Sequence, residues 1–137
     1  MIVELVPLNT VHIVWRHVED YLKATLEKSA GEFNIDHVKA HVVAGLQSLY
    51  IALDKDTNKI AGAATVNFIN YPNYRLAYVT AMGGKMITNE DNWKKLALLL
   101  KQAGATRCHA SASDSATRLY ESKVGFKKIY NTVERIL

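Results

Sequence analysis

The spacing of apolar positions changes several times along the chain, and each change predicts a new element. Residues 1–8 form a short apolar run that Pro7 closes, which predicts a strand. A helix is expected next, because apolar residues then recur at the helical period, at Val11, Val14, Trp15, Val18, Leu22 and Leu26. After Gly31 a second helix is expected from Asn34, with Val38, Val42 and Leu46 facing inward.

The middle of the chain reads as three strands and a helix. Apolar runs at residues 49–53 and 60–69 flank the turn-rich segment 54–58, which predicts a hairpin. Small residues at 61–64 would let another segment pack closely against that strand. Residues 76–82 form the next strand, and a helix is expected to begin at Thr88 or Asn89, with an apolar face made by Trp93, Leu96, Ala97 and Leu100.

The last third predicts a strand at residues 106–112, a helix at 113–123 and one or two strands at 126–137. The element order is therefore β-α-α-β-β-β-α-β-α-β. It predicts an α/β fold of the mixed α+β kind, with a sheet of six or seven strands covered by helices on both faces. The strands at 76–82 and 106–112 are expected to run parallel and to diverge at their C-terminal ends, because a helix joins them as a crossover.

Composition supports one domain spanning residues 1–137, since 49% of the residues are apolar and no linker or repeat interrupts them. The single cysteine, Cys108, cannot form an internal disulfide, so an intracellular, cytoplasmic location is expected. No apolar run reaches the length of a membrane span. The net charge of +4 and the pI near 9.2 permit an acidic ligand, but the scattered basic residues do not favour nucleic acid. Composition leaves a homodimer open.

One segment carries a family resemblance. Residues 113–126 read SDSATRLYESKVGF. With the element order, this segment resembles the closing part of the Gcn5-related N-acetyltransferases, which reads Asn-x-x-Ala and then Tyr-Glu-Lys-Leu-Gly-Phe. The resemblance covers the whole chain. In size, and in the placement of Met82-Gly83-Gly84 and Gly125-Phe126, the chain also looks similar to small members of the family encoded by tailed bacteriophages.

The resemblance implies a cofactor, acetyl-coenzyme A, and an amine acceptor. In the family the pantetheine arm enters a gap between two diverging strands, and backbone amides of a loop and a helix start bind the pyrophosphate. The matching residues here are Thr80, Ala81, Met82, Gly83, Gly84 and Lys85, with Asp114 at the family's asparagine position. The family's loop reads Gln or Arg, x, x, Gly, x, Gly or Ala, whereas no Gln or Arg stands three residues before either glycine here.

Two carboxylates, Glu90 and Asp91, lie at the start of the helix that follows this loop. There they favour the helix but would repel a pyrophosphate that approaches the same amides. If the chain binds coenzyme A, both should turn away from the anion site and Lys85 should reach it. If the chain has lost the cofactor, one of the two carboxylates should occupy that position itself.

Two residues are candidates for catalysis. The resemblance implies that Tyr120 protonates the departing thiolate, although matching it to the family's tyrosine requires one inserted residue, and its place on an apolar stripe also suits a core aromatic. No Asp, Glu or His occurs between residues 60 and 82, so His109, a water or a residue of the first helices would have to serve as base. Cys108 is read as a small buried apolar residue rather than a nucleophile.

The sequence leaves two functions open. The first is an acyl transferase that acts on an amine. The second is an inactive relative of the same fold with a structural or host-interaction role in a phage, located in the host cytoplasm or the virion. His37 and His41 stand four apart on a predicted helix, but no third metal ligand is evident, and the sequence predicts no metal site.

Overall fold

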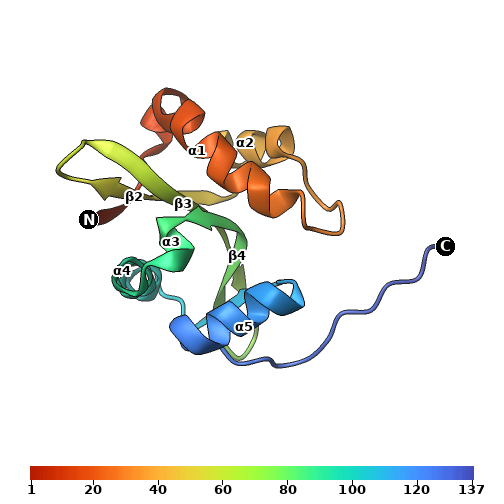
Figure 1. Cartoon of the computed structure of the whole chain (residues 1–137). Helices are drawn as coiled ribbons and strands as arrows, with labels where there is room; N and C mark the ends of the chain where they lie inside the picture. The colour runs from red at the N-terminus through yellow and green to blue at the C-terminus, as the bar shows by residue number, and fades with distance from the viewer.

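The computed structural model describes all 137 residues. It contains one five-stranded sheet in the order β1-β2-β3-β4-β5 (Figure 1). The strands are β1 (Ile2–Leu5), β2 (Ser48–Asp54), β3 (Lys59–Asn70), β4 (Arg75–Gly84) and β5 (Arg107–Ala110). The first three pairings are antiparallel, while β4 and β5 run parallel. The predicted parallel pair is therefore confirmed.

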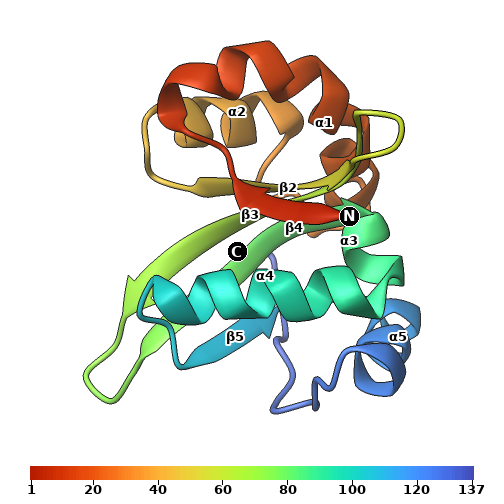
Figure 2. The ribbon, with the colours of Figure 1, turned by 90° about the vertical axis from the view of Figure 1, so that its left-hand side faces the viewer.

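Helices cover both faces of this sheet (Figure 2). A 3-10 turn (Leu8–Thr10), α1 (Val11–Leu26) and α2 (Ile35–Val43) precede β2. A short α3 (Lys85–Thr88) follows β4 directly, and α4 (Glu90–Gln102) and α5 (Asp114–Lys123) flank β5 along the chain. Helices α1 and α2 lie on one face, and α4 lies on the other (Figure 2). The mixed α+β architecture with two covered faces is the one that the element order predicted.

The sheet separates two apolar cores. One lies under α1 and α2 and includes Trp15, and the other includes Trp93 of α4 and Tyr120 of α5. Both tryptophans are buried, as their positions on apolar stripes predicted. None of the helices has both the length and the apolar character needed to cross a membrane.

Three sequence expectations about the elements were wrong. The sheet has five strands rather than six or seven, because residues 126–137 pair with nothing in this chain and form no strand. Helix α2 ends at Val43, so Leu46 is 62% exposed rather than inward. The loop after β4 contains the extra helix α3, which four residues form with no apolar periodicity to reveal it.

The α2 histidines have separate structural roles. Asn34 and His37 form a reciprocal cap, in which the Asn34 side chain accepts from the His37 amide at 2.9 Å and His37 Nδ1 accepts from the Asn34 amide at 3.2 Å. His41 instead faces Gln47, with its Nδ1 3.4 Å from the Gln47 amide nitrogen. The two rings therefore serve the helix start and the helix end, and no cluster of three metal-binding side chains occurs.

Candidate functional site

The parallel pairing of β4 with β5 stops while β4 continues. The pairing begins with Leu76 opposite Arg107 and ends with Val79 opposite Ala110, the last residue of β5. Strand β4 extends five residues further, to Gly84. Beyond Val79, β4 therefore has a strand partner only on its β3 side. This is the expected result of two strands that diverge at their C-terminal ends, and it leaves the β5 side of residues 80–84 without a strand partner.

A β-bulge at Thr80 marks the same point in β4. Thr65 pairs with Ala81 and Val66 pairs with Val79, so Thr80 has no opposite residue on β3. A bulge of this kind bends the strand and increases its twist. It also resets the alternation of side chains, because Val79 faces the α4 core whereas Ala81 faces the α1 core. The bulge thus lies where β4 leaves β5.

A buried polar chain holds this bulge. The Thr80 hydroxyl donates to Gln47 Oε1 at 2.6 Å and lies 2.7 Å from the Thr65 hydroxyl. The Gln47 amide in turn contacts His41 Nδ1. Sequence reasoning missed Gln47 and Thr65, because nothing in a single sequence marks a polar residue as buried.

The two glycines at the end of β4 serve close packing. A Cβ on Gly83 would lie 2.2 Å from the carbonyl oxygen of Tyr21 in α1. A Cβ on Gly84, which has φ +63°, would lie 2.5 Å from the Ala61 carbonyl oxygen and 2.8 Å from the Tyr21 ring. Both missing side chains therefore make room for α1 and β3.

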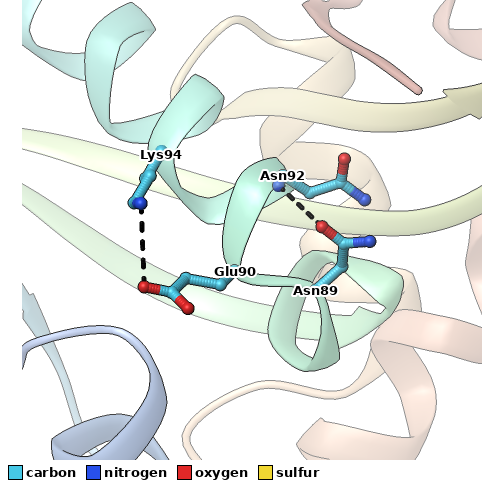
Figure 3. Close-up of polar contacts among 4 residues, drawn as sticks. All are labelled: Asn89, Glu90, Asn92 and Lys94. Atoms are coloured by element: carbon cyan, nitrogen blue, oxygen red, sulfur yellow. Dashed lines mark hydrogen bonds and ion pairs between the residues drawn. The ribbon is translucent and has the colours of Figure 1, made fainter.

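The start of α4 is closed by its own cap (Figure 3). The Asn89 side chain accepts from the Asn92 amide at 3.0 Å, which confirms Asn89 as the N-cap. Asn92 is buried, and its side chain donates to the Lys85 carbonyl at 3.1 Å. The hydrogen bond from the Asn92 side chain thus links α4 to the backbone of α3 inside the molecule. The Lys85 side chain itself is exposed.

Neither of the two acidic residues takes part in this cap. Glu90 lies 3.8 Å from Lys94, one turn along, and both side chains are mostly exposed (Figure 3). Asp91 is also exposed, and neither carboxylate accepts a hydrogen bond from a helix amide. The arrangement expected of a built-in substitute for pyrophosphate, with a carboxylate on the helix amides, is therefore absent.

Tyr120 lies at the boundary between the α4 core and open space. Its ring is 5.4 Å from that of Phe126, and the residue is 7% exposed. Burial, and secondarily the neighbouring Cys108, raises the pKa of the Tyr120 hydroxyl. Burial also raises the pKa of the Cys108 thiol to about 12. Cys108 is therefore a protonated, apolar neighbour of Tyr120 rather than a thiolate nucleophile.

His109 lies on the opposite face of β5 from Cys108, because successive side chains on a strand alternate. It stands beside Tyr78 in the parallel register, and its ring is 6.3 Å from that of Tyr74. The Tyr78 hydroxyl bonds to Ser111 just beyond β5. His109 thus belongs to a polar and aromatic surface that α1 and α2 leave uncovered.

A cavity of about 480 Å³ brings several of the predicted site residues together. His109, Asp114 and Tyr120 line it, together with Tyr78 and the segment 126–132. The predicted cofactor residues 80–85 do not. The structure therefore brings both candidate catalytic residues and Asp114 to one cavity. The end of β4 and the loop after it lie outside the lining of this cavity.

Comparison with solved structures defines the fold class. The chain has the fold of the Gcn5-related acetyltransferases, and similar structures match it over almost its whole length at low sequence identity. No protein-family model and no curated protein matches the sequence.

Three of these structures illustrate the likeness. A probable acetyltransferase is 14% identical with a TM-score of 0.71, and the alignment covers 100% of this chain and 97% of the other. A predicted acetyltransferase from Clostridium acetobutylicum, crystallised with acetyl-CoA, is 16% identical with a TM-score of 0.65 over 98% and 95%. An aminoglycoside acetyltransferase from an uncultured soil metagenomic sample, in complex with sisomicin, is 13% identical with a TM-score of 0.68 over 99% and 96%.

Proposed function

We propose that this chain binds an acyl-coenzyme A and transfers its acyl group to an amine. The observation that carries the proposal is the end of β4–β5 pairing at Val79–Ala110, beside a cavity that contains Tyr120 and His109. A similar structure crystallised with acetyl-CoA supports the cofactor class. Another, crystallised with sisomicin, supports an amine acceptor.

The unpaired edge of β4 at residues 80–84 suits the amide-bearing arm of coenzyme A better than its pyrophosphate. Coenzyme A carries amide groups along an extended arm, and residues 80–84 offer an unpaired strand edge whose backbone groups can pair with such amides. The pyrophosphate has less support, because Gly83 and Gly84 pack against α1 and Asn89 already holds the Asn92 amide. We therefore assign the arm to the β4 edge, and the phosphates to the exposed Lys85 side chain.

When bound, the cofactor supplies the acyl group as a thioester. Transfer requires that the attacking amine lose one proton and that the departing sulfur gain one. Tyr120 would donate a proton to the sulfur, since its raised pKa keeps the hydroxyl protonated at neutral pH. His109, on the other face of β5, would accept the proton from the amine. The two groups therefore serve opposite sides of the reacting carbon.

Thermal unfolding with and without ligand tests binding. At 100 times its dissociation constant, a ligand adds roughly 2.7 kcal/mol to the free energy of unfolding. We expect acetyl-CoA and pantetheine to raise the melting temperature, and ADP to have little effect. No shift with millimolar acetyl-CoA would refute the proposal.

Two substitutions separate binding from chemistry. Tyr120→Phe removes the hydroxyl alone, so acetyl-CoA should still raise the melting temperature while release of free thiol with a panel of primary amines falls at least 100-fold. His109→Gln should shift the pH profile of the same reaction. Asp36→Asn, on an exposed site in α2, is the matched control and should leave both measurements unchanged. Wild-type rates in Tyr120→Phe would show that the tyrosine is only a core residue.

An inactive relative is the second candidate. The observation that favours it is the occupied cap at α4 together with the packed glycines, which together leave little backbone for a pyrophosphate. In that case the protein has a structural or host-interaction role, and no acyl-CoA raises its melting temperature.

A further inference from the structure

One arginine of the sheet, Arg107 at the start of β5, has no partner for its charge. Its guanidinium carbon lies 4.2 Å from the centre of the Tyr74 ring, and the exposed side chain forms no hydrogen bond or ion pair. The other arginine of the sheet, Arg75, donates to the Asn70 side chain and to the Ala103 carbonyl oxygen. Arg75 therefore supports the fold, whereas all five N–H donors of Arg107 are free to bind a ligand.

Arg107 and His109 lie on the same face of the sheet and contact one aromatic ring. They are two residues apart on β5, so their side chains project to the same side. The centre of the Tyr74 ring is 4.2 Å from the Arg107 guanidinium carbon and 6.3 Å from the centre of the His109 ring. The guanidinium carbon and the imidazole centre are therefore separated by at most about 10.5 Å, the sum of these two distances.

No carboxylate cancels the charge of Arg107 on this face. The strands β3, β4 and β5 contain no Asp or Glu. In the cavity beside His109, two acidic residues are matched by two basic ones, Asp114 and Glu121 by Lys127 and Lys128. The unbalanced charge next to His109 is thus that of Arg107, which favours an anionic group on a ligand and disfavours a second ammonium group.

We propose that Arg107 determines the acceptor specificity, and that this site takes an α-amino acid whose carboxylate binds Arg107 while its amine faces His109. The inference rests on the proposed acyl transfer, to which it adds the class of acceptor. The planar fork of an arginine matches the two oxygens of a carboxylate, so the contact can be bidentate. A lysine or an imidazolium offers no such fork.

The separation of the two groups suits a ligand with one carbon between amine and carboxylate. A hydrogen bond places the amine nitrogen about 4 Å from the imidazole centre, and a bidentate contact places the carboxylate carbon about 4 Å from the guanidinium carbon. Of the largest separation, about 10.5 Å, roughly 2.5 Å then remains. This is the distance across one tetrahedral carbon, from the amine nitrogen to the carboxylate carbon of an α-amino acid.

The carboxylate takes no part in the chemical step. The amine nitrogen bonds to the acyl carbon, the carbon–sulfur bond breaks, and the products are an N-acyl amino acid and the free thiol. His109 takes the proton that the amine loses, and Tyr120 donates the proton that the sulfur gains. Arg107 therefore acts on binding and orientation of the acceptor, and its removal should affect KM more than kcat.

Release of free thiol with matched acceptors is the first test. A panel of α-amino acids is compared with the corresponding α-amides, which keep the amine and the side chain but lose the negative charge. For the best amino acid we expect kcat/KM at least tenfold above that of its amide. Equal values for the acid and its amide in the wild type would overturn the proposal.

Substitution of Arg107 tests whether this residue causes the preference. Arg107→Gln should raise KM for the amino acid at least tenfold and leave kcat/KM for the amide nearly unchanged, while Arg107→Lys, which keeps the charge but not the fork, should retain part of the preference. Arg16→Gln, at an exposed arginine of α1, is the matched control and should keep the full preference. An equal loss with both acceptors in Arg107→Gln would show a structural role and refute the assignment.

Direct binding distinguishes a failure of this inference from a failure of acyl transfer. Nuclear magnetic resonance spectra of the ¹⁵N-labelled full chain are recorded with the same amino acid and no acyl-CoA. We expect shifts of the β5 backbone amides, with a dissociation constant at least tenfold higher in Arg107→Gln. Such binding without thiol release from any amine would refute acyl transfer and support the carboxylate site. Thiol release with simple amines, but neither binding nor reaction of any amino acid, would support acyl transfer and overturn the inference.

Discussion

Substituting Gly83 by alanine tests whether the glycines at the end of β4 serve packing. The new Cβ would lie 2.2 Å from the Tyr21 carbonyl oxygen and 2.9 Å from the carbonyl carbon. Both are backbone atoms of α1, so no side-chain rotation can relieve the contact, and α1 must shift away from the sheet. Overpacking of this kind costs typically 1–3 kcal/mol, and we expect a loss at the upper end, about 3 kcal/mol.

A second glycine separates this clash from backbone strain. Gly31 has φ +90°, and a Cβ added there would meet no atom within 4 Å, so Gly31→Ala introduces strain without a clash. The left-handed conformation costs alanine about 1–2 kcal/mol, and the reduced entropy of the unfolded chain offsets part of it. We expect Gly31→Ala to cost about 1 kcal/mol.

Urea unfolding followed by circular dichroism measures both variants. The midpoint should fall about three times further for Gly83→Ala than for Gly31→Ala, with similar slopes. Equal shifts in the two midpoints would mean that α1 moves away at little cost. The packing explanation of Gly83 would then be wrong.

Three further predictions concern stability. Asn89→Ala should lower the free energy of unfolding by about 1 kcal/mol, because it removes the α4 cap, whereas Glu90→Gln should change it by less than about 0.5 kcal/mol. The urea midpoints of the two variants test this, and a larger effect at Glu90 would contradict its exposed position. Thr80→Val should cost about 1–3 kcal/mol because it leaves the buried Gln47 oxygen without its donor, and a neutral result would show that water replaces the hydroxyl. Burial raises the pKa of the Cys108 thiol from 9.0 to about 12, so above pH 9 the folded chain keeps a proton that the unfolded chain loses. The free energy of unfolding should therefore fall as pH rises from about 9 towards 12, and Cys108→Ala should make that fall smaller. The same pH dependence in the wild type and the variant would refute the raised pKa of Cys108.

The sequence predicted the elements that depend on local pattern. Apolar spacing placed α1 and α4 with Trp15 and Trp93 inside, and the crossover through α4 gave the parallel pairing of β4 with β5. These features follow from the helical period and from the handedness of connections, which a single sequence expresses directly.

The features that shape the site depend on long-range contacts instead. The bulge at Thr80 left no signal, because Val79 and Ala81 are both apolar and fit either face of a strand. The role of Gly83 depends on how closely α1 approaches β4, which its neighbours in sequence do not specify. Residues 126–137 were predicted as strands from their pattern alone, and a pattern cannot state whether a partner strand is present in the same chain.

The contact of α1 with the end of β4 has a mechanical consequence. The Gly83 backbone meets the Tyr21 backbone directly, and the Tyr21 hydroxyl donates to the Ile60 carbonyl on β3 at 3.1 Å. A close-packed protein interior has low compressibility and transmits strain. No side chain separates the two backbones at this contact, so a displacement of α1 would also move the end of β4 that leads into α3.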